Sequence, residues 1–175
     1  MTTTWVVAGL AAAGLGNAAY AAEPPSAVQQ LSNAKISLPE AVHMAEREGD
    51  GKATAVGFRP ERKGSGWYEV TVLRIDGRRL TRYRLDAGSG RIIEASNEPI
   101  RRALTRVTPQ QIADAGTSLT SAIDMAEQRT GGRALEAAVE HRHGEVSYEV
   151  RVTRLDGATE RVQIEAATGH LASAE

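Results

Sequence analysis

The sequence predicts an α+β protein of two repeated units, each a helix packed on a three- or four-stranded antiparallel sheet. One observation is an internal repeat: YEVTVLRIDG at 68–77 returns as YEVRVTRLDG at 148–157. Another is that apolar residues at helical spacing open each unit. The third is that alternating strands with an Asp-Gly turn follow. Two copies are too few for a solenoid, so the pattern favours a duplicated small domain.

The N-terminal segment differs in composition from the rest. Its first 22 residues carry no charged side chain, and its apolar run is too short to span a bilayer. Ala19-Tyr20-Ala21 is a small-x-small cleavage signal, so we predict a signal peptide at 1–21 and a flexible leader at 22–35. An uncleaved membrane anchor is the alternative. Both interpretations place the remainder outside the cytoplasm, in the bacterial periplasm or the medium.

The repeat extends beyond the ten residues that define it, and the offset between matching blocks drifts from 81 to 79 residues. These matches divide the chain into a first unit, a linker with a short helix and a second unit, at 36–97, 98–116 and 117–175.

Each unit is predicted to begin with a helix. Ser37 can cap the first helix, with Glu40 completing a capping box and Pro39 in the first turn. The second helix repeats the apolar stripe of the first. In the linker, Thr108 and Gln111 form the same box signal, so a further short helix is expected there.

The Asp-Gly dipeptides at 76–77 and 156–157 predict two hairpins. A two-residue turn at 76–77 pairs Tyr68 with Leu85 and Val70 with Tyr83, with all four on one face. The same turn at 156–157 would put apolar residues on the wrong face. We therefore expect a three-residue loop or a bulge there, with the pairs Val152–Val162 and Val150–Ile164.

The remaining strands are expected from alternation around Val56 and Ala137, and from short segments after Gly90 and Gly169. The helix of each unit should cover the apolar face of its sheet and leave the other face polar and solvated.

Composition and motifs argue against several functional classes. The chain has no cysteine, which excludes disulfides and thiolate zinc sites, and its net charge of −1 argues against general nucleic-acid binding. Its repeated acids, such as Asp76 and Asp86, stand at turn signals, where they bind backbone. No constellation indicates a nucleophile or a phosphate loop. We expect neither an enzyme nor a cofactor.

His141 and His143 flank Arg142 and would share one side of a continuing strand. That spacing suits Zn²⁺ or Cu²⁺ if a third ligand is available, but no third ligand is evident from the sequence. These histidines are the candidate metal ligands of an alternative function.

Charge differs between the units. Residues 36–97 carry 11 basic and 9 acidic side chains, whereas 117–175 carry 6 and 10. RRLTRYR at 78–84 predicts a basic strand that places Arg82 and Arg84 with Trp67 and Glu69 on the solvated face. These four residues are either an ordinary solvated surface or a docking face for an acidic partner or anionic lipid headgroups.

Each unit resembles a PepSY domain. The family pattern has a short Ala-rich helix, a Tyr-x-Val-x-Val strand, an Asp-Gly turn, and Asp-Ala-x-Thr-Gly before an apolar residue. The two copies read YEVTV with DAGSGRI, and YEVRV with EAATGHL. Ser89 and Glu165 depart mildly from the pattern. The resemblance covers nearly all of 36–95 and 117–173.

The resemblance implies a role without catalytic residues. PepSY domains occur in the propeptides of thermolysin-like metallopeptidases and in secreted or envelope proteins, and are thought to bind or restrain peptidases. We therefore expect an exported protein-binding module that modulates or inhibits a peptidase or an envelope sensor. Its contact would be an edge strand or the solvated face with Trp67, Glu69, Arg82 and Arg84. The alternative is a periplasmic protein that binds a metal or another small ligand.

Overall fold

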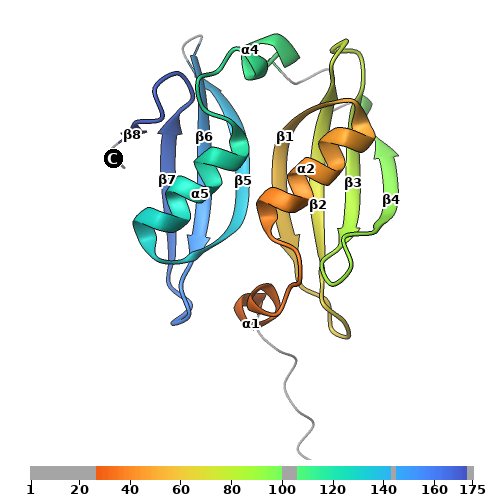
Figure 1. Cartoon of the computed structure of the whole chain (residues 1–175), viewed down its shortest axis with the longest axis vertical. Helices are drawn as coiled ribbons and strands as arrows, with labels where there is room; N and C mark the ends of the chain where they lie inside the picture. Colours follow the sequence, from red (N-terminus) through yellow and green to blue (C-terminus); the bar gives the residue numbers. More distant parts are fainter. Residues whose placement is uncertain (1–26, 100–105, 143–144, 173–175) are drawn as a thin grey trace, which may run out of the picture.

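The two repeated units share one antiparallel sheet in the computed structural model, which describes residues 27–99, 106–142 and 145–172. The sheet has eight strands in the order β4-β3-β2-β1-β5-β6-β7-β8. The two long helices, α2 and α5, lie side by side over it (Figure 1).

The helices are α1 (Ala27–Ser32), α2 (Leu38–Gly49), α4 (Pro109–Ala113) and α5 (Leu119–Thr130). The strands are β1 (Gly51–Arg59), β2 (Trp67–Arg74), β3 (Leu80–Asp86), β4 (Ile92–Asn97), β5 (Arg133–Arg142), β6 (Glu145–Thr153), β7 (Thr159–Glu165) and β8 (Leu171–Ala172).

The predicted helix starts are confirmed. Ser37 caps α2, its side chain accepts from the Glu40 N–H, and the Glu40 carboxylate accepts from the Ser37 N–H at 2.6 Å. Thr108 and Gln111 make the same reciprocal box at α4. These bonds satisfy backbone N–H groups that have no partner within the helix, so each helix begins where its cap stands.

The first hairpin has the predicted register. Tyr68 faces Leu85 and Val70 faces Tyr83 across β2 and β3. The turn itself is longer than the predicted two residues, because the Arg74 N–H donates to the Arg79 carbonyl at 2.9 Å and leaves residues 75–78 between them. Inside it, the Gly77 N–H donates to the Arg74 carbonyl at 2.8 Å. Gly77 has φ +67°, a conformation that glycine adopts without strain.

The second hairpin has the predicted three-residue loop but not the predicted pairs. Arg154 and Ala158 close the loop through a backbone hydrogen bond of 2.9 Å. Val150 therefore faces Val162, and Tyr148 faces Ile164, in place of the expected Val152–Val162 and Val150–Ile164. The observed and expected registers differ by two residues. Such a shift keeps every side chain on the same face, so alternation alone cannot distinguish them.

A bulge interrupts the first strand of each unit at equivalent positions. The pairing of β1 with β2 shifts between Ala53 and Ala55, and that of β5 with β6 between Ala134 and Glu136. Thr54, two residues before Val56, therefore departs from the alternation expected around Val56, and its hydroxyl donates to the Thr71 carbonyl at 3.3 Å. An extra residue in one strand reverses which later side chains face the core.

The expectation of a flexible leader is wrong for its C-terminal part. Residues 27–32 form α1, and Leu31 is only 2% exposed as a member of the core. The Gln30 side chain also accepts a hydrogen bond from the Glu61 N–H at 2.9 Å. The predicted signal peptide at 1–21 lies outside the described residues. Every helix within those residues is too short or too polar to cross a membrane.

The α+β class and the antiparallel pairing are confirmed, but the units do not have separate sheets. β1 pairs with β5 through three facing residue pairs, centred on Val56 and Ala137. We call this junction the seam. Buried residues from both units form one hydrophobic cluster beneath α2 and α5. Because a unit of this size has a thin core, merging the two sheets buries apolar surface that each unit alone would expose.

Candidate functional site

The tyrosine of the repeated Tyr-Glu-Val sequence has a structural role in both units. The Tyr68 hydroxyl donates to the Ile36 carbonyl at 2.7 Å, and the Tyr148 hydroxyl donates to the Thr117 carbonyl at 2.7 Å. Each bond ties the central strand of a unit to the residue before its helix cap. Burial raises the pKa of both phenols to about 12, so they stay neutral and able to donate.

The repeated acidic residues at turns and helix ends also bind backbone. Glu46 accepts from the Ala53 N–H at 2.8 Å, and Glu127 accepts from the Ala134 N–H at 2.7 Å. Asp86 accepts from the hydroxyl and the N–H of Ser89, and the hydroxyl bond in particular lowers the pKa of its carboxyl. These carboxylates hold turns closed and are not arranged as an acid–base pair.

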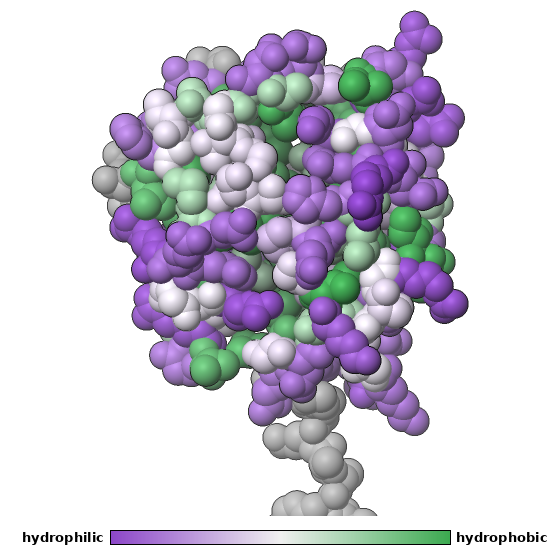
Figure 2. Space-filling model, viewed as in Figure 1, coloured by the Kyte–Doolittle hydropathy of each residue, from purple (hydrophilic) through white to green (hydrophobic). Residues whose placement is uncertain are grey.

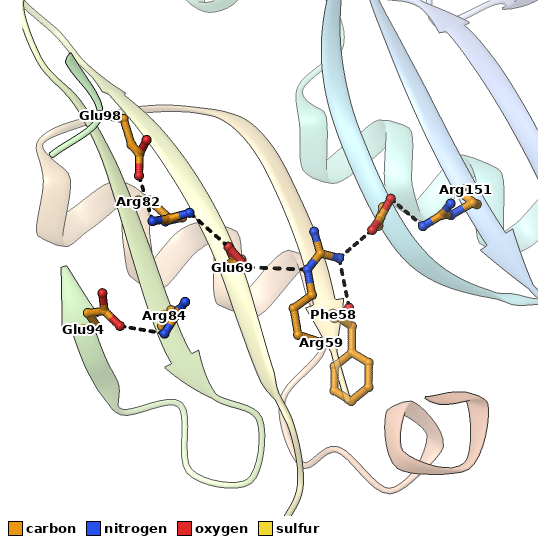
Figure 3. A network of polar contacts seen from close by, with 9 residues as sticks. Phe58, Arg59, Glu69, Arg82, Arg84, Glu94, Glu98 and Arg151 are labelled. Atoms are coloured by element: carbon orange, nitrogen blue, oxygen red, sulfur yellow. Dashed lines mark hydrogen bonds and ion pairs between the residues drawn. The ribbon is translucent and has the colours of Figure 1, made fainter. Parts of the chain in front are cut away.

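The sheet face opposite α2 and α5, which we call the open face, carries a chain of alternating charges. It runs across β3, β2, β1, β5 and β6 and crosses the seam (Figure 3). Its members in order are Glu98, Arg82, Glu69, Arg59, Glu136 and Arg151. The Arg82–Glu98 contact is 2.9 Å and the Arg151–Glu136 contact is 2.6 Å. Most of these charges are therefore already neutralised within the molecule.

The four predicted contact residues do share the open face. The Arg84 guanidinium lies over the Trp67 ring, 5.7 Å from its centroid, and pairs with Glu94 at 2.7 Å. Arg82 and Glu69 belong to the charge chain. The Nε1 of Trp67 and the Nε of Arg84 are buried and make no hydrogen bond within the described residues. Two N–H donors on this part of the face thus have no acceptor there.

The expectation of a uniformly polar face is wrong at one end. Leu73 faces Leu80 across β2 and β3, on the same side as Glu69 and Arg82, and both leucines are buried. Two buried side chains of the linker, Val107 and Ile112, also lie outside the main core cluster.

A shallow hollow of about 230 Å³ lies on the open face at the seam. Small residues line it beside charged ones, among them Ala55, Gly57, Ala138, Arg59 and Glu136. A Cβ at Gly57 would lie 3.0 Å from a guanidinium nitrogen of Arg59 and 3.1 Å from the Glu136 Cγ. Gly57 therefore makes room for the ion pair that joins the two units. Sequence patterns did not reveal this hollow, because it exists only where β1 meets β5.

The candidate metal ligands are not brought together within the described part of the chain. The Nε2 of His141 lies 3.5 Å from the Nε2 of Gln111, and His143 lies outside the described residues. No cluster of three His, Cys, Asp or Glu side chains among the described residues could hold a metal ion. No observation on those residues favours the metal-binding alternative.

The basic stretch 78–84 is divided by the structure into two parts. Arg82 and Arg84 are paired on the open face, whereas Arg78 and Arg79 stand exposed in the β2–β3 turn. Neither turn arginine forms an ion pair with another described residue. A comparison of the two repeats could have identified these turn arginines from the sequence. Arg78 and Arg79 follow the first Asp-Gly, whereas the uncharged Ala158 and Thr159 follow the second.

Comparisons with known proteins locate the repeat in a family. A model described as "Peptidase propeptide and YPEB domain", or PepSY, matches residues 35–95 and 118–175. A crystal structure titled as a "putative lipoprotein" from Clostridium difficile 630 aligns with 15% identity and a TM-score of 0.48. That alignment covers 86% of this chain and 99% of the other. No match was found among curated proteins.

Proposed function

Because the chain belongs to the PepSY family, we propose that it is an exported, non-enzymatic module that binds another protein and modulates it. Domains of this family are typically extracellular regulatory or inhibitory modules and are generally not catalytic. A peptidase or an envelope sensor is the partner class that this membership supports. The predicted signal peptide at 1–21 supports delivery to the periplasm or the medium.

One observation carries the proposal: the open face of an eight-stranded sheet whose two long helices lie on the other side (Figure 1). We place the contact around Trp67, Arg84, Arg82 and Glu69. Tryptophan and arginine contribute strongly to binding at protein interfaces. The Arg84 guanidinium stacked on the Trp67 ring would present a cation and an aromatic edge together to a partner.

The test is capture of the partner by the whole chain, followed by binding measurements with that partner once purified. The variant Trp67→Ala/Arg82→Ala/Arg84→Ala should weaken binding by about tenfold or more, since it removes an aromatic anchor and two cations. Arg62→Ala/Lys63→Ala changes two exposed cations of the β1–β2 loop and should bind normally. Equal affinity of both variants would exclude this face, and absence of any partner would argue against the function itself.

A further inference from the structure

The turn between β2 and β3 concentrates exposed basic side chains around an apolar one. We call it the basic turn, formed by Arg74, Ile75, Asp76, Arg78 and Arg79. Ile75 is 67% exposed. Figure 2 shows an apolar spot bordered by hydrophilic residues at the end of the molecule where this hairpin turns.

The charge balance at the basic turn differs from that of the open face. Five cations border the hollows around it: Arg47, Lys52, Arg74, Arg78 and Arg79. Within the described part of the chain, only Arg74 has an ion-pair partner, Asp76 at 3.6 Å. Three acids border the same hollows, and one of them, Glu46, is held by the Ala53 N–H. Unpaired cations remain free to meet carboxylates of a partner.

The surface around Ile75 is concave. A hollow of about 430 Å³ separates the turn from α4, where Pro109 and Ala113 line it together with Ile75. A second hollow of about 420 Å³ lies between Ile75 and the C-terminal end of α2. Hollows on two sides of an apolar residue can receive side chains of a polypeptide, whereas a flat layer of lipid headgroups would not fill them.

The equivalent turn of the second unit shows that these arginines are not needed for the fold. It also exposes an apolar residue, Leu155, which is 88% exposed. Its neighbouring cations, however, are paired within the unit, Arg154 with Glu160 at 2.9 Å and Arg133 with Glu127 at 3.6 Å. The equivalent hairpin thus forms without the basic cluster. The cluster is therefore not required for the hairpin to fold, which favours a role in binding.

We propose that the basic turn is the docking site for an acidic segment of a partner protein. Carboxylates of that segment pair with Arg78 and Arg79, and one of its aliphatic side chains packs against Ile75 in the hollow beside α4. This inference rests on the proposed protein-binding function and adds the chemistry of the partner. The site is separate from the open face, because it lies at the end of the β2–β3 hairpin.

The experiment measures binding of a fluorescent synthetic peptide of alternating glutamate and leucine to the whole chain at low salt. The variant Arg78→Glu/Arg79→Glu should weaken binding by about tenfold or more, because attraction becomes repulsion at two contacts. Arg62→Glu/Lys63→Glu makes the same change in net charge at the β1–β2 loop and should leave affinity within about twofold, as remote exposed charges are screened. Ile75→Ser should weaken binding by a few-fold, whereas Leu155→Ser should not.

Several results would overturn the docking site. The first is that the two charge-reversal variants bind the peptide with equal affinity. The second is that Ile75→Ser leaves peptide binding unchanged. The third is that the chain binds phosphatidylglycerol vesicles but not the peptide. Arg78→Gln/Arg79→Gln, measured with circular dichroism, keeps the test valid if charge reversal disturbs folding. If the chain binds the peptide through the basic turn but captures no partner, the result supports the docking site and contradicts the proposed protein-binding function. If a partner binds the Arg78→Glu/Arg79→Glu variant as tightly as the unaltered chain, the result contradicts the docking site and supports the proposed protein-binding function.

Discussion

At the scale of the residue, conserved chemistry between the two repeats is mostly structural. Tyr68 and Tyr148 tie their strands to the residues before the helix caps, and Glu46 and Glu127 tie the helices to the following strands. Some of the residues that differ between the repeats are exposed and available for binding. Arg78 and Arg79 have no basic counterpart in the second unit, and neither forms an ion pair with another described residue, although their neighbour Arg74 does.

We expect Tyr68→Phe and Tyr148→Phe each to lower the free energy of unfolding by about 1–2 kcal/mol, because the partly buried hydrogen bond from the phenol to the Ile36 or Thr117 carbonyl is lost. Urea denaturation measures the change. Tyr83→Phe is the matched control, since Tyr83 is also buried but its hydroxyl makes no hydrogen bond with a described residue. A similar loss for all three variants would contradict the assigned role of the two hydroxyls.

The same two phenols predict how stability depends on pH. Their folded pKa is about 12, raised from 10.0 by burial, so the folded state holds these protons more tightly than the unfolded state. The resulting stabilisation is fully present below pH 10 and is lost as pH rises from 10 to 12. Ultraviolet absorbance of tyrosinate, followed with circular dichroism, should show the two groups ionising late and together with unfolding. Ionisation of all four tyrosines near pH 10 with the fold intact would contradict this.

At the scale of the element, helix ends and turns follow local rules that the sequence displays. The caps of α2 and α4 and the register of the first hairpin were predicted from a few neighbouring residues and are confirmed. The register of the second hairpin was wrong by two residues, because face alternation repeats with that period. The bulges at Thr54 and Leu135 were also missed, since an extra residue in a strand leaves little local trace.

For the α2 cap, Ser37→Ala should lower the free energy of unfolding by about 1 kcal/mol, because the Glu40 N–H loses the hydroxyl oxygen that accepts its hydrogen bond. Thermal or urea denaturation measures it. Ser37→Asp supplies another carboxylate acceptor at the cap and should retain most of the stability. Equal stability of the alanine variant and the unaltered chain would show that the box contributes nothing.

At the scale of the whole molecule, the seam between β1 and β5 converts two thin units into one sheet with one core. It also creates the hollow at Gly57 and extends the charge chain from Glu98 to Arg151 across both units. The resulting open face is broader than a single PepSY unit presents. The proposed contact around Trp67 and Arg84 lies on this face, whereas the basic turn lies at one end of the sheet.

A shared core predicts that damage in one unit destabilises both. Ile123 is fully buried in the second unit, and Ile123→Ala should cost about 2–4 kcal/mol. Trp67 in the first unit reports the consequence by fluorescence, with Trp5→Phe removing the other tryptophan. The Trp67 transition and the far-ultraviolet circular dichroism should move together to lower urea. A Trp67 transition that stays in place would mean that the units unfold independently.

The sequence by itself determined the duplication, the capped helices, the class of the fold and the first hairpin, because each depends on residues close together in the chain. Tertiary structure alone decided the pairing of β1 with β5, the docking of α1 through Leu31 and the separation of Arg78 and Arg79 from Arg82 and Arg84. These features depend on contacts between distant segments. Antiparallel edges of similar composition can pair in several ways, and only burial of a common core selects one.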